Sequence, residues 1–123
     1  MSKLHTEAFT EWTATTTIAA AAGNGTLNGP AAQPTMRNFV LSASVSFAGA
    51  TVTTVGTITM NFGAANTYVF QVPVGSTGLY LNLSWTKAVR CDINFQPTIV
   101  LAGFTAAGAP ATSINMGGYK VRE

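Results

Sequence analysis

The side chains that could carry acid–base, metal or nucleophilic chemistry are few in this chain of 123 residues, and they lie far apart. There is one histidine, His5, and one cysteine, Cys91. The four carboxylates are equally scattered: Glu7, Glu11, Asp92 and Glu123. A nucleophilic thiol needs a neighbouring base, a metal site needs several converging ligands, and a glycosidase needs two paired carboxylates. Because no spacing in the sequence supplies these arrangements, we expect no catalytic residue, no metal site and no cofactor.

Cys91 and its two neighbours form the closest cluster of such groups. Arg90 precedes the thiol, and an adjacent cation can lower a thiol pKa. No base is near in the sequence, since His5 would have to fold back across the molecule. We therefore interpret Cys91 as a core or loop thiol, while Arg90 and Asp92 suit solvated loop charges, a local ion pair or a bridge to a neighbouring subunit. An enzyme that uses His5 and Cys91 together remains an alternative function.

The polar residues of the chain are mostly uncharged. Charged residues make up 8% of it, against about 25% in an ordinary soluble domain. From residue 38 to residue 86 there is no Asp, Glu, Lys, Arg, His or Cys. The net charge of +2 comes from six scattered Lys and Arg residues, which a nucleic-acid binder would cluster on one face. The composition indicates an architectural or adhesive protein whose Thr-, Ser- and Asn-rich surface is covered by neighbours, with no nucleic acid as a partner.

The apolar runs and the N-terminus give no sign of a membrane span or an export signal. An Ala-rich run closes residues 1–23, but Glu7 and Glu11 interrupt the apolar segment that a signal peptide requires. Every apolar stretch is broken before the roughly 18 residues that a membrane helix needs. A lone cysteine forms no internal disulfide. We expect one domain, compatible with a reducing cytoplasm, and no membrane partner.

Period-two patterns predict the strands. Residues 39–47 alternate between an apolar odd face and a serine-rich even face. The odd face, which we expect in the core, consists of Phe39, Leu41, Ala43, Val45 and Phe47. Residues 57–62 and 68–72 have even apolar faces, and residues 63–66 between them predict a hairpin that joins two antiparallel strands.

The second half of the chain continues the pattern. Residues 79–85 predict a strand, and the side chains expected to face the core are Leu79, Leu81, Leu83 and Trp85. Tyr80 falls on the outer face. Strands are also predicted over 98–104 and 112–121, where Gly117 and Gly118 indicate a bulge that shifts the inward face by one residue. Six or seven strands about ten residues apart predict an all-β fold, a single antiparallel β-sandwich of the jelly-roll type.

The first 35 residues differ in composition from the rest. We interpret residues 1–35 as an extended N-terminal arm and residues 36–123 as the β-sandwich domain. Within the arm, Trp12–Ile18 favours a strand because threonine is β-branched, with a helix over Thr17–Ala22 as the alternative. We expect Trp12 and Ile18 to anchor the arm on a partner, since large apolar side chains are stabilised by burial.

Two segments carry a resemblance to a known group of proteins, Val89-Arg90-Cys91-Asp92-Ile93-Asn94 and Ile114-Asn115-Met116-Gly117-Gly118-Tyr119. Together with the strand pattern over residues 36–121, they resemble the closing strands of small β-sandwich structural proteins of tailed bacteriophage particles. The resemblance implies a non-enzymatic capsid decoration, or cement, protein that binds and stabilises the assembled shell. It also implies a virion location after synthesis in the host cytoplasm, the major capsid protein or other virion subunits as partners, and a homo-oligomer, with a trimer favoured.

On this hypothesis the partner-binding residues are Trp12, Ile18, Tyr80, Lys87 and Arg90. The first two belong to the expected arm, Tyr80 is an outward ring, and Lys87 and Arg90 are the nearest approach to a cationic patch in the sequence. The alternative function is a receptor- or glycan-binding tip module of a phage fibre or tail, in which Tyr80 or Tyr119 would stack against a sugar ring.

Overall fold

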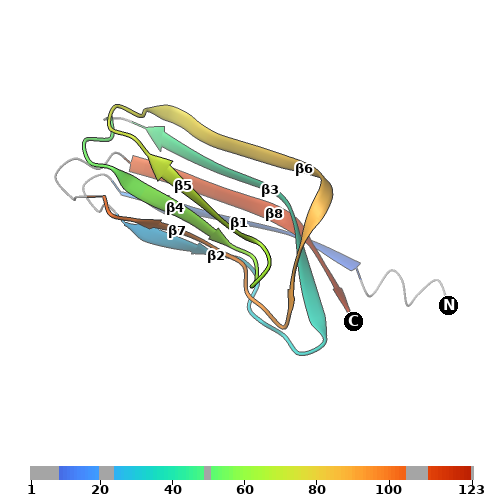
Figure 1. Ribbon diagram of the computed structural model, residues 1–123. Helices are drawn as coiled ribbons and strands as arrows, with labels where there is room; N and C mark the ends of the chain where they lie inside the picture. The colour runs from blue at the N-terminus through green and yellow to red at the C-terminus, as the bar shows by residue number, and fades with distance from the viewer. Residues whose placement is uncertain (1–8, 20–23, 49–50, 105–110, 123) are drawn as a thin grey trace.

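The protein is a sandwich of two antiparallel β-sheets (Figure 1). The computed structural model describes residues 9–19, 24–48, 51–104 and 111–122. Eight strands lie in these ranges: β1 (Phe9–Ile18), β2 (Gly25–Asn28), β3 (Met36–Ala48), β4 (Gly56–Asn61), β5 (Thr67–Val72), β6 (Gly78–Ile93), β7 (Thr98–Ala102) and β8 (Ala111–Arg122). Sheet A has the order β1-β8-β3-β6, and sheet B has the order β2-β7-β4-β5. The described residues contain no helix that is long and apolar enough to cross a membrane.

The strands pair in a nested way. β1 pairs with β8, β2 with β7, β3 with β6 and β4 with β5, all antiparallel. Successive pairs alternate between the two sheets, and the β3–β8 and β4–β7 contacts join the pairs within each sheet. Eight strands arranged in this way form a jelly roll. The predicted all-β fold and the antiparallel β-sandwich are confirmed.

The core lies between the inner faces of the two sheets. Its fully buried side chains come from both sheets, and the larger ones include Val40, Val45, Phe47, Ile58, Met60, Phe62, Ile99, Leu101 and Ile114. The even apolar face predicted for β4 is present, as Ile58 and Met60 are buried, and β8 also buries its even residues Ile114 and Met116. Burying one such side chain contributes about 1.5 to 3 kcal/mol. Period two therefore identifies the inner faces correctly where the pairing is regular.

A β-bulge in β3 changes which residues of that strand face the core. Val40 pairs with Gly118 and Ser42 pairs with Gly117, so Leu41 has no partner on β8. The buried positions of β3 consequently switch from even before the bulge to odd after it. The prediction that Phe39 and Leu41 face the core is wrong. Both lie on the outer face.

The glycine pair of β8 lies opposite this bulge. The sequence predicts a bulge here, but the extra residue belongs to β3, and β8 keeps its even buried face through Gly118. A side chain at Gly118 would collide with the carbonyl oxygen of Phe39. The two backbones can approach this closely only because residue 118 is glycine.

Irregular pairing between β3 and β6 also alters the predicted faces of β6. Four residues, Trp85 to Ala88, lie between the positions that pair with Ser42 and Val40, and β6 bends there (Figure 1). A second register shift lies between the partners of Val45 and Ser46. Beyond it Leu79 is 60% exposed, whereas Tyr80 packs against the core. The predicted positions of Leu79 and Tyr80 are therefore exchanged.

The described part of residues 1–35 differs from the expected arm. β1 pairs with β8 along all ten of its residues, and β2 pairs with β7. Trp12 packs against the core, and Ile18 is only 8% exposed. The strand predicted over Trp12–Ile18 is confirmed, and the alternative helix is not formed at residues 17 and 18, while residues 20–22 lie outside the described ranges. These residues are edge strands of the sandwich because their alternate side chains complete its core.

Replacing Trp12 by alanine tests this role of β1. Because the indole packs against the core of the same chain, we expect Trp12→Ala to lower the free energy of unfolding by about 2 to 4 kcal/mol. Thr13→Ala, at the adjacent exposed position, is the matched control and should change it by less than about 0.5 kcal/mol. Urea denaturation measures both. An arm that is independent of the body would make the two variants equally neutral.

Candidate functional site

The structure does not bring the five expected partner-binding residues together. Trp12 and Ile18 face the core from β1, so neither is available as an anchor on another protein. Tyr80 packs beside Phe47, with ring centroids 5.8 Å apart, and its hydroxyl donates a 2.8 Å hydrogen bond to the carbonyl oxygen of Gln71. This bond links β6 of sheet A to β5 of sheet B. Of these five residues, only Lys87 and Arg90 are exposed.

Cys91 is a core thiol. It is 1% exposed, and burial, with a smaller contribution from the nearby Asp92 carboxylate, raises its pKa from 9.0 to about 12. The Arg37 guanidinium acts in the opposite direction on the pKa of Cys91, and its Nη1 donates a 2.7 Å hydrogen bond to the Cys91 carbonyl oxygen. The thiol is therefore protonated at neutral pH and is not poised as a nucleophile. His5, its only candidate base, lies outside the described residues.

The charged residues that the structure describes lie at one end of the sandwich. The charged residues in the described ranges are Glu11, Arg37, Lys87, Arg90, Asp92, Lys120 and Arg122. All seven belong to sheet A and lie level with the Leu41 bulge or beyond it, toward the end where β1 begins and β8 ends. We call this region the charged end. Its five basic and two acidic residues make it cationic.

A depression of about 470 Å³ lies at the charged end. It is lined by Thr10, Gln33, Pro34, Thr35, Met36, Lys120 and Arg122. The ammonium of Lys120 donates a 3.3 Å hydrogen bond to Oε1 of Gln33, which ties β8 to the connection between β2 and β3. Thr35, in the same connection, has a left-handed backbone conformation with φ of 64°. The depression presents two cations beside neutral polar groups.

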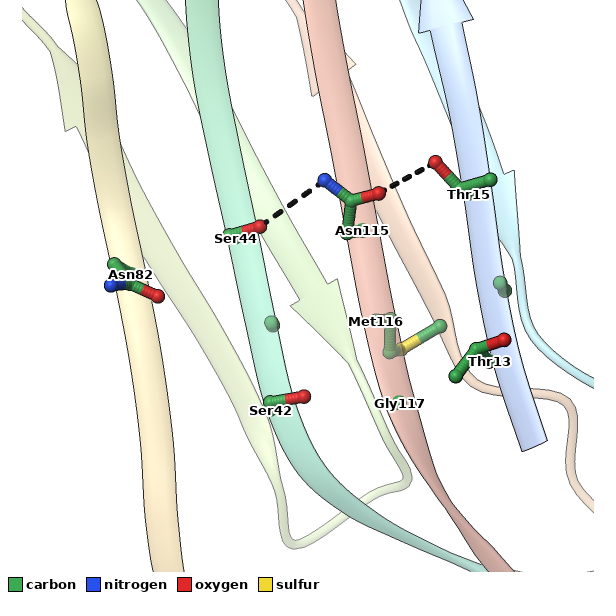
Figure 2. Close-up of a pocket in the computed structure, with 10 residues that line it drawn as sticks. Thr13, Thr15, Ser42, Ser44, Asn82, Asn115, Met116 and Gly117 are labelled. Atoms are coloured by element: carbon green, nitrogen blue, oxygen red, sulfur yellow. Dashed lines mark hydrogen bonds between the residues drawn. The ribbon is translucent and has the colours of Figure 1, made fainter. Parts of the chain in front are cut away.

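The outer face of sheet A carries rows of uncharged polar side chains. Thr15, Asn115, Ser44 and Asn82 are cross-strand partners, so one row spans all four strands. Thr15 Oγ1 donates a 2.6 Å hydrogen bond to Oδ1 of Asn115, whose Nδ2 donates a 3.3 Å bond to Ser44 Oγ (Figure 2). The next row, toward the charged end, consists of Thr13, Gly117, Ser42 and Ser84.

These rows line a shallow groove. One depression of about 410 Å³ lies over the Asn115 row and reaches Gly117 (Figure 2). A second, of about 350 Å³, continues toward Glu11 and Tyr119. The two depressions share Thr13, Ser42 and Gly117, and together we call them the sheet A groove. Because Gly117 has no side chain, the floor of the groove is open where the depressions meet.

An aromatic pair stands at the end of the groove. The rings of Tyr119 and its cross-strand partner Phe39 are stacked with centroids 5.0 Å apart and an angle of 14° between their planes. Glu11 pairs with Tyr119 from the other side, on β1. The groove thus runs from amide and hydroxyl groups at one end to an aromatic ring and a carboxylate at the other.

The sheet A groove is not visible in the sequence because its members come from four strands that are distant in the chain. Alternating serines at 42, 44 and 46 indicate an outward polar face, but they do not show that Asn115 and Thr15 lie in the same row. In the part of the chain that the structure describes, no three His, Cys, Asp or Glu residues are grouped so that they could hold a metal ion. In comparisons with known proteins, no family model matches the chain, and no curated protein matches its sequence.

The pKa of Cys91 predicts a pH dependence of stability. Above pH 9 the unfolded thiol ionises while the folded thiol keeps its proton until about pH 12, so the free energy of unfolding should fall as the pH rises through this window. Cys91→Ala removes the thiol, so the free energy of unfolding of this variant should fall less steeply over the same pH range. Urea denaturation of both proteins at several alkaline pH values measures the difference, and equal slopes would contradict the assignment.

Proposed function

We propose that the chain is a non-enzymatic structural protein that attaches to a larger assembly, as a capsid decoration protein attaches to a virion shell. One observation carries the proposal: the described charges are confined to one end of the sandwich, and the broad faces beyond it are neutral. The resemblance of the closing strands to phage structural proteins agrees with it.

Neutral faces are suited to burial against other subunits. Burying an unpaired charge costs several kcal/mol, whereas hydroxyl and amide groups can find new hydrogen-bond partners in an interface. All strands of sheet B lack charged residues, and so do the rows of sheet A on the far side of the bulge. Neighbouring subunits can therefore cover the outer face of sheet B without leaving a charge buried and unpaired, while the neutral rows of sheet A stay open.

The charged end is suited to contact an acidic surface. A cationic patch at one end directs the molecule during its approach and fixes the orientation in which it docks. Lys120 and Arg122 on β8 lie at the same end of sheet A as Lys87 and Arg90 on β6, and β3 runs between the two strands. On this proposal the shell presents carboxylates to that end.

The attachment would stabilise the shell by mass action. A protein that binds the assembled shell, but not its free subunits, shifts the equilibrium toward the shell as any ligand favours the state to which it binds. This mechanism needs no reaction and no cofactor. It requires only that the docking residues stay exposed in the free protein.

Charge reversal at the charged end tests the attachment. The double variant Lys120→Glu, Arg122→Glu should bind at least tenfold more weakly to shells that lack this chain, because two attractive contacts become repulsive. A tenfold loss corresponds to about 1.4 kcal/mol of binding free energy. Thr77→Glu, in the exposed turn at the opposite end, is the control and should bind normally. Co-sedimentation at low and high salt measures binding. The proposal is wrong if the unaltered chain fails to sediment with shells, or if both variants bind as it does.

We further propose that copies of the chain associate as a trimer through the outer face of sheet B. Thr26, Val100, Thr59 and Val69 form a cross-strand row on that face. Val69 is 61% exposed, and no charged residue occurs in these strands. Covering a face of threonine and valine removes apolar surface from water, which stabilises the associated state.

A charge placed in this row should prevent association. Light scattering coupled to size exclusion should give three times the chain mass for the unaltered protein and a lower mass for Val69→Glu, because a buried carboxylate without a partner is unfavourable. Thr77→Glu again serves as the control and should keep the larger mass. If the unaltered chain elutes as a monomer, the trimer is refuted, and the proposed attachment to a shell is unaffected.

A further inference from the structure

We infer that the sheet A groove is a binding site for a neutral oligosaccharide. This inference goes beyond attachment to a shell, since the groove lies on the outer face of sheet A and the cations of the depression at Lys120 and Arg122 do not line it. It rests on the shape of the groove, on its hydrogen-bonding groups and on the aromatic pair at its end.

The amide of Asn115 is held in one orientation with part of its capacity unused. Its Oδ1 accepts from Thr15 and its Nδ2 donates to Ser44, which fixes the amide plane across three strands. A side-chain amide has two N–H donors and an oxygen with two lone pairs. One donor and one lone pair therefore remain for a ligand, and the exposed amide of Asn82 lies further along the same row.

This pairing of a donor with an acceptor matches sugar hydroxyls. Each hydroxyl group both donates and accepts a hydrogen bond, as do the hydroxyls of Thr13, Ser42 and Ser44. A pre-oriented amide flanked by hydroxyls can engage two neighbouring hydroxyls of one sugar without reorganising. An apolar ligand would instead leave these groups without partners.

The aromatic end of the groove supplies a flat apolar wall. Tyr119 is held by its stack on Phe39, so its ring is fixed before a ligand arrives. The C–H faces of a sugar ring are apolar and can cover such a ring, while the Glu11 carboxylate beside it can accept hydrogen bonds from two hydroxyls.

The groups that line the groove also determine the charge of the ligand. Its lining contains no Lys, Arg or His, and its one charged group is the carboxylate of Glu11. A phosphate, sulfate or uronate would therefore find no cation in the groove to pair with, and it would meet the Glu11 carboxylate at one end. Because the two depressions are continuous, the site suits a chain of sugar units rather than a single one. The ligand is accordingly an uncharged oligosaccharide.

Titration of the isotope-labelled full-length chain, followed by nuclear magnetic resonance, tests the inference. The probes are cellohexaose, xylohexaose, maltohexaose and chitohexaose, with a galacturonic acid oligomer as the charged comparison. At least one neutral probe should give saturable shifts of the Asn82 and Asn115 side-chain amides and the Gly117 backbone amide, with a Kd on the order of a millimolar or tighter. The charged oligomer should give none.

Two variants locate the site. Gly117→Val fills the floor. Its Cβ would lie 3.3 Å from Ser42 Oγ, so the Ser42 side chain, at an exposed position, must shift by a few tenths of an ångström, and unchanged backbone signals away from the groove would show that the fold is kept. We expect Gly117→Val to weaken binding at least tenfold, and Asn82→Ala to weaken it several-fold. Thr77→Val, at an exposed position just before β6, lies outside the groove and outside the sheet B row, so it is the control and should bind as the unaltered chain does.

Three outcomes would overturn the inference. The first is that none of the neutral probes shifts the groove amide signals. The second is that the shifts persist unchanged in Gly117→Val, and the third is that the groove signals change with protein concentration alone. The last result would assign the groove to contact between copies of the chain. Co-sedimentation of Gly117→Val with shells keeps this test separate from the proposed attachment, because loss of sugar binding should leave sedimentation unchanged.

Discussion

The double pairing of β8 is the interaction on which the rest of the structure depends. β8 lies between β1 and β3, so it supplies backbone partners to both and joins the outermost pair of the nest to the β3–β6 pair within. Its inward side chains Ile114 and Met116 are buried against sheet B. The close approach at Gly118 belongs to the same interaction, because it admits the Leu41 bulge and so decides which side chains of β3 face outward.

Alternation in the sequence was sufficient to predict the fold class, but not the faces of every strand. β4 follows simple alternation, and its inward residues are correctly predicted, whereas β8 keeps its even inward face through Gly118, where the sequence predicts a shift by one residue. In β3 both Phe39 and Val40 are apolar, so a one-residue insertion leaves no trace in the pattern, and Phe39 is assigned to the wrong side. The strand over Trp12–Ile18 is predicted, but its place inside the sandwich is not, because its partner β8 lies at the far end of the chain.

The candidate site was less predictable than the fold, for a related reason. The low charge of the middle of the chain is visible in the sequence, and it indicates surfaces that other molecules cover. The positions of the charges are set by pairing: Glu11, Arg37, Arg90 and Lys120 are far apart in sequence and gather only because four strands run antiparallel. The same holds for the sheet A groove, whose central row takes one residue from each strand.

The nesting of the pairs has a consequence for the order in which the molecule can form during synthesis. A ribosome releases β1 first and β8 last, and sheet A lacks its second strand until residues near 122 have emerged. Until then the apolar face of β1 has no neighbour in its sheet, and the inner hairpin β4–β5 is the pair closest in sequence. Contacts between such distant segments form slowly, so the uncovered strands are exposed to pairing with other chains for longer than in a fold built from local pairs.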